Sequence, residues 1–163
     1  MKKTFVSKEK LEEIVQQFPT PFHLYDEKGI RENVKELYEA FSWNKGYKEF
    51  FAVKATPNPF LINILHEYGC GTDCSSMTEL MLSEAIGIHG HDVMFSSNDT
   101  PLEEFQKADQ IGAIINLDDI THIEKVEGRL VRFRKRCPAV TIPADCLRSA
   151  MILWTAPVMQ STV

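Results

Sequence analysis

Hydrophobic positions alternate along most of the chain between short apolar runs and longer amphipathic stretches. The apolar runs lie at residues 50–54, 70–74, 92–97 and 113–118, and the amphipathic stretches at 59–68, 76–86, 101–110 and 119–127. The runs recur about every twenty residues, which is the spacing of strand–helix units. Because consecutive parallel strands need a helical crossover between them, this pattern predicts an α/β fold with a parallel sheet and flanking helices.

Two further helices and a strand are predicted ahead of these units. Ser7 precedes an amphipathic segment and can cap it as a helix. Asp26 is placed to cap a longer helix, in which Ile30 and Val34 belong to an apolar series at three- and four-residue steps. Between the two helices, the short apolar run 22–26 predicts another strand.

Four strand–helix units fit either an open doubly wound sheet or half of an eight-stranded barrel. In both architectures, functional residues gather at the C-terminal ends of the strands. Residues 54–59, after the first of these strands, contain no glycine-rich turn that would hold a dinucleotide phosphate. Lys54 closes that strand and Asp73 lies near the end of the next. Lys54 is either an ordinary strand-end lysine or a nucleophile whose amine is tuned by its surroundings.

The composition is that of an ordinary globular protein. The chain has 163 residues, of which 44% are apolar and 25% charged, and this length favours one domain. No apolar run approaches the roughly 18 residues of a membrane helix. The basic N-terminus passes directly into a charged amphipathic segment, so no secretory signal is predicted. We expect a cytoplasmic protein that binds neither membranes nor nucleic acid.

The cysteines are expected to be reduced thiols rather than disulfides. The chain has four cysteines and no export signal. Cys70 and Cys74 lie close together and His66 is nearby, but no second thiol pair follows to complete a tetrahedral zinc site. The sequence therefore predicts no metal site.

Three segments carry a resemblance to a known family. They are TPFHLYD (20–26), FAVKATPNP (51–59) and GCGTDCSSMTELMLSEAIG (69–87). They resemble, in order and spacing, the motifs of the alanine-racemase-like enzymes that use pyridoxal 5'-phosphate. The closest likeness is to the barrel domain of the diaminopimelate/ornithine/arginine decarboxylase family, and it extends from about Thr20 to Glu127. The resemblance implies that residues 1–128 are the N-terminal half of a pyridoxal-phosphate-binding (β/α)8 TIM barrel, incomplete in this chain.

The same resemblance implies three site residues. Lys54 matches the lysine that binds pyridoxal 5'-phosphate covalently, and Asp73 and Glu79 match residues near the cofactor. Both carboxylates also have structural interpretations. Asp73 precedes the helix predicted at 76–86 and can cap it. Glu79 can form a capping box with Ser76, three residues before it.

The family implies a carboxy-lyase as the function. The resemblance favours a fragment of diaminopimelate decarboxylase, which converts meso-diaminopimelate to lysine. The alternatives are a fragment of an ornithine or arginine decarboxylase and a non-catalytic half-barrel binding module. Intact members are homodimers, and their barrel continues into further strands, a phosphate-binding loop and a β-domain. We therefore expect the 163-residue chain to be inactive on its own.

The last part of the chain differs from the rest. Residues 1–128 hold 12 Lys and Arg against 22 Asp and Glu, whereas residues 129–163 hold 6 against 1 and follow neither a helical nor a strand period for most of their length. Back-translating residues 139–145 with permitted synonymous codons, and reading from the third base, gives RYNPGG, which resembles a fifth-strand motif of the family. We interpret residues 129–163 as a non-family tail, translated out of frame.

Overall fold

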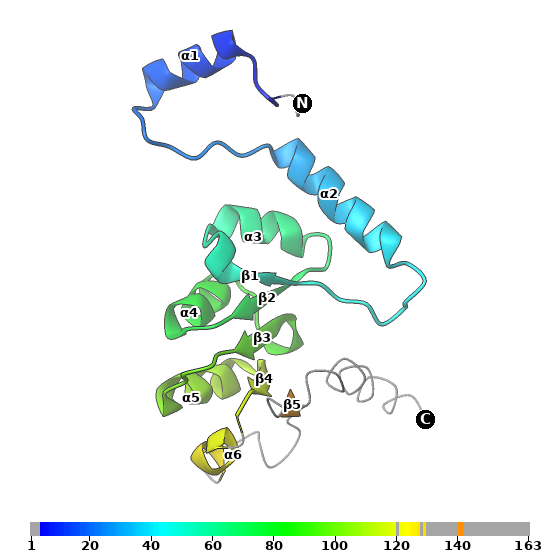
Figure 1. Ribbon diagram of the computed structural model, residues 1–163, viewed down its shortest axis with the longest axis vertical. Coiled ribbons are helices and arrows are strands. Elements are labelled where there is room, and N and C mark those ends of the chain that lie inside the picture. The colour runs from blue at the N-terminus through cyan, green and yellow to red at the C-terminus, as the bar shows by residue number, and fades with distance from the viewer. Residues whose placement is uncertain (1–3, 120, 128, 130–139, 142–163) are drawn as a thin grey trace.

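The computed structural model describes residues 4–119, 121–127, 129 and 140–141, and its centre is a parallel sheet (Figure 1). The strands are β1 (Phe50–Ala52), β2 (Gly71–Cys74), β3 (Val93–Ser96), β4 (Ile114–Leu117) and β5 (Val140–Thr141), in the order β1-β2-β3-β4-β5. They alternate with the helices α3 (Pro59–His66), α4 (Met77–Ala85), α5 (Leu102–Ile111) and α6 (Thr121–Val126). Every neighbouring pair of strands is parallel. The predicted α/β fold and its four strand–helix units are confirmed.

The two faces of the sheet differ because side chains alternate along each strand. In β3, Val93 and Phe95 are fully buried, whereas Met94 and Ser96 between and after them are only partly buried. The buried set packs against the helices, and the rings of Phe95 and Phe105 meet edge to face at 5.9 Å. The core lies between the sheet and its helices. The side chains on the opposite face of the sheet are therefore not part of this core.

A buried chain of polar groups joins β2 to α4. Ser83 of α4 donates a hydrogen bond from Oγ to Thr72 Oγ1 at 3.0 Å, and its Oγ lies 3.3 Å from Cys74 Sγ. All three side chains are fully buried. Burial also raises the pKa of the Cys74 thiol to about 11, so this cysteine is a neutral core residue. These contacts fix the helix against the strand.

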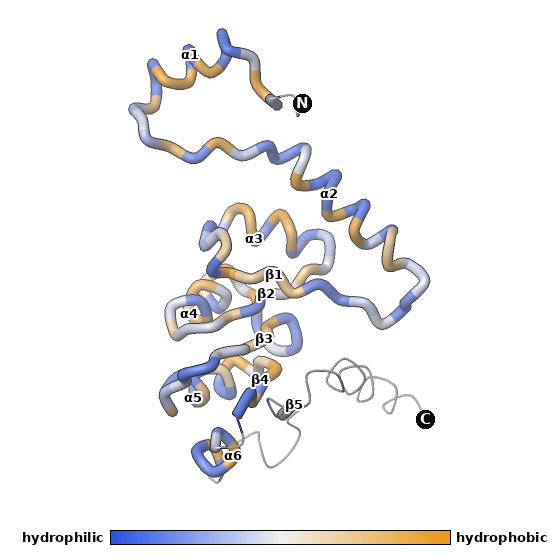
Figure 2. The backbone as a smooth tube through the Cα atoms, in the orientation of Figure 1, coloured by the Kyte–Doolittle hydropathy of each residue, from blue (hydrophilic) through white to orange (hydrophobic). Residues whose placement is uncertain are grey.

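Two helices precede the sheet: α1 (Lys8–Gln17) and α2 (Glu27–Ala40). Both predicted caps are confirmed, since Ser7 Oγ and Asp26 Oδ1 each accept a hydrogen bond from a backbone N–H in the first turn, at 3.2 and 3.1 Å. Helix α1 lies away from the sheet in Figure 1, and none of its residues is buried. Hydrophobic and hydrophilic positions nevertheless alternate along it in Figure 2. Its apolar side chains therefore contribute nothing to the core of the described part of the chain.

The prediction of a strand at residues 22–26 is wrong. This segment is not part of any strand, and Leu24 and Tyr25 are 37% and 43% exposed. A strand forms only where its backbone groups find partners. β1 is the edge of the sheet, and among the described residues no strand pairs with its outer side. The apolar content of the segment predicted a strand without identifying a partner for it.

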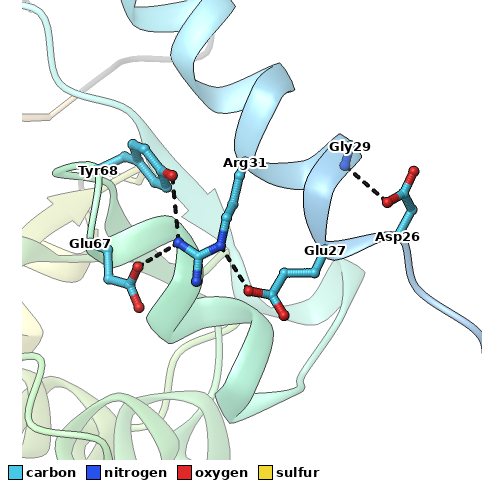
Figure 3. A network of polar contacts seen from close by, with 6 residues as sticks. All are labelled: Asp26, Glu27, Gly29, Arg31, Glu67 and Tyr68. Carbon is cyan, nitrogen blue, oxygen red and sulfur yellow. Dashed lines mark hydrogen bonds and ion pairs between the residues drawn. The ribbon is translucent and has the colours of Figure 1, made fainter.

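A polar network fixes α2 against the end of α3 (Figure 3). Arg31 donates from Nε to Glu27 at 2.8 Å and from Nη1 to Glu67 at 2.5 Å, and Nη1 also lies 3.5 Å from the Tyr68 hydroxyl. The guanidinium lowers the pKa of the Glu67 carboxyl below its ordinary value. Because Glu67 is exposed, this ion pair orients the helix more than it stabilises the fold.

The tail interpretation lies almost wholly outside the described residues. Of residues 129–163, the structure describes 129 and the two residues of β5. Within the described part of the chain, none of the helices has the length and apolar content that crossing a membrane requires.

Candidate active site

Lys54 lies just beyond the strand that was predicted to contain it. β1 ends at Ala52, and residues Val53–Ala55 form a single 3-10 turn, η1. Val53 is fully buried and anchors the turn in the core, whereas Lys54 is exposed. The turn closes where the N–H of Thr56 donates to the Val53 carbonyl at 3.1 Å. The amine is therefore carried at the C-terminal end of β1 by a backbone that the core holds in place.

Asp73 lies at the same end of the sheet as Lys54. It is the register partner of Ala52 in the parallel β1–β2 pair, so Lys54 follows that partner by two residues. Its neighbours Thr72 and Cys74 are buried towards α4, and alternation places Asp73 on the opposite face. The sheet thus brings together two of the three predicted site residues.

Several groups set the charge state of Asp73. Burial is the largest influence and raises the pKa of its carboxyl above the ordinary value. The Ser96 hydroxyl, which donates to Asp73 Oδ1 at 2.6 Å, and the positive charge of Lys54 both lower this pKa. The negative charge of Glu79 raises it. Lys54, Asp73 and Glu79 are therefore close enough to interact electrostatically.

Glu79 contacts Ser76 at the start of α4 as their spacing predicts, but the backbone N–H that its carboxylate binds is that of Ser75 and not that of the N-cap Ser76. Its carboxylate accepts hydrogen bonds from the Ser75 N–H at 2.9 Å and from Ser76 Oγ at 3.0 Å, and its own N–H lies 3.4 Å from Ser76 Oγ. Ser76 is the N-cap of α4, so the alternative in which Asp73 caps this helix is wrong. The cofactor roles of Lys54, Asp73 and Glu79 stay predictions.

The sequence did not indicate two further polar groups on this face of the sheet. Ser96 ends β3 and contacts Asp73, and Asn116 of β4 is the register partner of Ser96. The Asn116 side-chain oxygen is buried and has no hydrogen-bond partner among the described residues. The signal that could have found both is the alternation along β3 and β4, once the register between the strands is known.

The structure also contains an apolar cavity of about 670 Å³ at the edge of the sheet. It is lined by side chains of α2, α3 and β1, including Val34, Leu37, Phe51 and Leu65. Neither Lys54 nor Asp73 lines it. Among the described residues, no three His, Cys, Asp or Glu side chains come together as a metal site would require.

Comparison with known proteins identifies the family. The model of the pyridoxal-dependent decarboxylase family, pyridoxal binding domain, matches residues 27–136. The chain belongs to this family. Protein TabA of Pseudomonas amygdali pv. tabaci is 43% identical over 116 residues, which are 71% of this chain and 27% of TabA. Diaminopimelate decarboxylase of Methanothermobacter thermautotrophicus is 31% identical over 128 residues, 75% of this chain and 30% of that protein.

Solved structures support the same fold. Ornithine decarboxylase from Entamoeba histolytica superposes with a TM-score of 0.63 at 27% identity, over 73% of this chain and 38% of that one. The structural relatives of the family are TIM barrels, of which this chain covers only a part. The chain spans about 30% of the length of the curated relatives named above.

The residues at the C-terminal end of the sheet fit the cofactor of this family, pyridoxal phosphate. An aldehyde is held covalently by a primary amine, and Lys54 presents one in an exposed position. A partly buried carboxylate lies beside it and balances its charge. The buried, unpartnered oxygen of Asn116 adds an acceptor on the same face. When bound, pyridoxal phosphate supplies an acceptor for the electrons that an amino acid releases as it loses carbon dioxide.

Proposed function

We propose that this chain is the N-terminal, cofactor-binding part of a longer amino-acid decarboxylase. The observation that carries the proposal is that Lys54, in the turn after β1, and Asp73, near the end of the neighbouring parallel strand β2, lie at the same end of the sheet in a member of the pyridoxal-binding family. Lys54 holds the cofactor through its Nζ. Asp73 keeps a negative charge beside that nitrogen, and Glu79 fixes the start of α4 next to them.

For the substrate we propose meso-diaminopimelate. The support is the 31% identity to the Methanothermobacter diaminopimelate decarboxylase and the motif resemblance of residues 51–59 and 69–87. Ornithine is the second candidate, because the Entamoeba ornithine decarboxylase is similar in both structure and sequence. Release of carbon dioxide from diaminopimelate, ornithine, arginine and lysine, each tested separately, distinguishes these substrates.

The proposal extends to the oligomeric state and the cellular location of the whole protein. We propose a homodimer that acts in the cytoplasm on a free amino acid. We also propose that the chain leaves the reading frame of the family within residues 129–163; the family model matches as far as residue 136. Sequencing the gene across codons 125–165 tests this proposal. A second reading frame that continues the family motifs would support it and would give the sequence of the full-length protein. A gene with no such frame would contradict it.

The deciding experiment maps the covalent contact between protein and cofactor. The full-length protein is incubated with pyridoxal phosphate, reduced with borohydride and digested, and the labelled peptide is identified by mass spectrometry. We expect the label on Lys54, and its loss together with decarboxylation in Lys54→Ala. Lys48→Ala is the matched control, because Lys48 precedes the same strand at its opposite end. It should keep the label.

Two results would overturn the proposal or its parts. A label on another lysine would remove Lys54 from the site. The 163-residue chain should show neither a stable label nor turnover, because it spans only about 30% of the length of its curated relatives and catalysis requires many well-positioned groups. Carbon dioxide release by this short chain would contradict that expectation.

A further inference from the structure

Ser96 has the most direct contact with the carboxylate of the candidate site. It is the last residue of β3, and its Oγ donates to Asp73 Oδ1 at 2.6 Å. The register explains the contact: Asp73 is paired with Met94, and Ser96 lies two residues farther along the same face. A hydroxyl donor at this distance from a carboxylate forms a strong, charge-assisted hydrogen bond.

This hydrogen bond fixes the orientation of the carboxylate. Once Oδ1 is held by Ser96 of β3, rotation of the Asp73 side chain is restricted. Among the described residues, the charged groups that act on Asp73 are Lys54 from the turn after β1 and Glu79 from α4. They act in opposite directions, so the neutral hydroxyl of Ser96 reinforces Lys54 in favouring the ionised carboxylate.

We propose that Ser96 is a positioning residue, which orients Asp73 and keeps it ionised beside Lys54. This inference rests on the proposed function, because its purpose is to hold a negative charge next to the lysine that carries the cofactor. Ser96 acts through Asp73 and needs no contact of its own with cofactor or substrate.

Three substitutions test the role of Ser96 in the full-length protein. Ser96→Ala removes the hydroxyl, whereas Ser96→Thr retains it. Ser97→Ala is the matched control, because Ser97 is the next residue and its backbone carbonyl, rather than its hydroxyl, accepts the hydrogen bond from Thr100. Thermal unfolding of each variant verifies that it is folded.

Two measurements report the charge state of the Asp73 carboxylate. The first is the titration of the Asp73 carboxyl in the cofactor-free protein, by carbon NMR with carboxyl-labelled aspartate and assignment through Asp73→Asn. The second is the pH dependence of the absorption of the lysine-bound cofactor. Losing one hydrogen bond to a charged group should raise the midpoint of the Asp73 carboxyl by about one to two pH units in Ser96→Ala. The midpoint of the lysine-bound cofactor should fall, because a less readily ionised Asp73 stabilises the protonated lysine nitrogen less. Ser96→Thr and Ser97→Ala should match the unsubstituted protein.

The outcomes separate this inference from the proposed function. If the unsubstituted protein shows no lysine-bound absorption, the proposed function fails, and the inference about its site fails with it. If that absorption is present but Ser96→Ala leaves both midpoints unchanged, the positioning role is overturned and the proposed function stands. An equal shift in Ser97→Ala would also overturn it, because the effect would then be a general disturbance of the loop.

Discussion

Ser83→Ala tests whether the buried polar chain between β2 and α4 fixes the framework of the site. Ser83 is fully buried, and its hydroxyl lies between Thr72 Oγ1 at 3.0 Å and Cys74 Sγ at 3.3 Å. Alanine removes that hydroxyl and leaves both partners buried. Because α4 also carries Glu79 and β2 carries Asp73, a loosened helix would move one carboxylate relative to the other.

The expected magnitude follows from the contacts that are lost. A neutral hydrogen bond contributes about 1 kcal/mol net, and leaving a buried polar partner unsatisfied costs about 1–3 kcal/mol. Ser83→Ala should therefore lower the free energy of unfolding by about 2 kcal/mol. Replacing Thr72 with valine in the same protein removes the stranded hydroxyl as well. The double variant should be less destabilised than the sum of the single variants, by about 1 kcal/mol.

Urea denaturation followed by circular dichroism measures these differences. Ser42→Ala is the control, because Ser42 is exposed and its substitution should change stability by less than about 0.5 kcal/mol. The reasoning is refuted if Ser83→Ala is no more destabilising than Ser42→Ala. Strict additivity of the Thr72 and Ser83 substitutions would equally show that the two hydroxyls do not depend on each other.

The remaining predictions concern charge, packing and association. Burial raises the pKa of the Asp73 carboxyl, so ionising this group destabilises the fold. The loss of stability develops as the pH rises from the unfolded-state pKa of about 4 through the raised folded-state pKa. Urea midpoints should therefore show Asp73→Asn gaining stability relative to the parent protein over this pH range. Phe105→Ala deletes a fully buried ring and should cost about 3–5 kcal/mol in the same assay, whereas a cost below about 1 kcal/mol would contradict the core. The open face around Met94 and Ile114 and the free edge of β1 should make the isolated chain associate, so a monomer at all concentrations in sedimentation would contradict this expectation.

The sequence predicted the regular elements well because each has a local cause. Apolar runs at regular spacing located four strands to within one or two residues, and Ser7 and Asp26 identified two helix starts by their capping side chains. The failures have non-local causes. The segment 22–26 has the composition of a strand but no partner. β1 stops before Lys54 because the chain turns there around the buried Val53, and this depends on the core as a whole.

The sequence likewise predicted some residues of the candidate site and missed others. Motif spacing located Lys54, Asp73 and Glu79, and it correctly predicted the contact between Glu79 and Ser76. Ser96 was missed because its contact with Asp73 joins residues 23 positions apart. Such a contact follows from the β2–β3 register, which sequence periodicity alone does not specify.

Alternation along the strands lets one short segment carry both the fold and the chemistry. In β2, Thr72 and Cys74 point into the core, and the intervening Asp73 points to the site. In β3, Phe95 fills the core and Ser96 contacts Asp73. Substitutions on the two faces should therefore have different main effects. Those on the core face should mainly lower the stability of the fold, and those on the site face should mainly change the charge state of Asp73. Since Ala52 pairs with Asp73, a shift of one residue in the β1–β2 register would exchange these faces and lose the core and the site together.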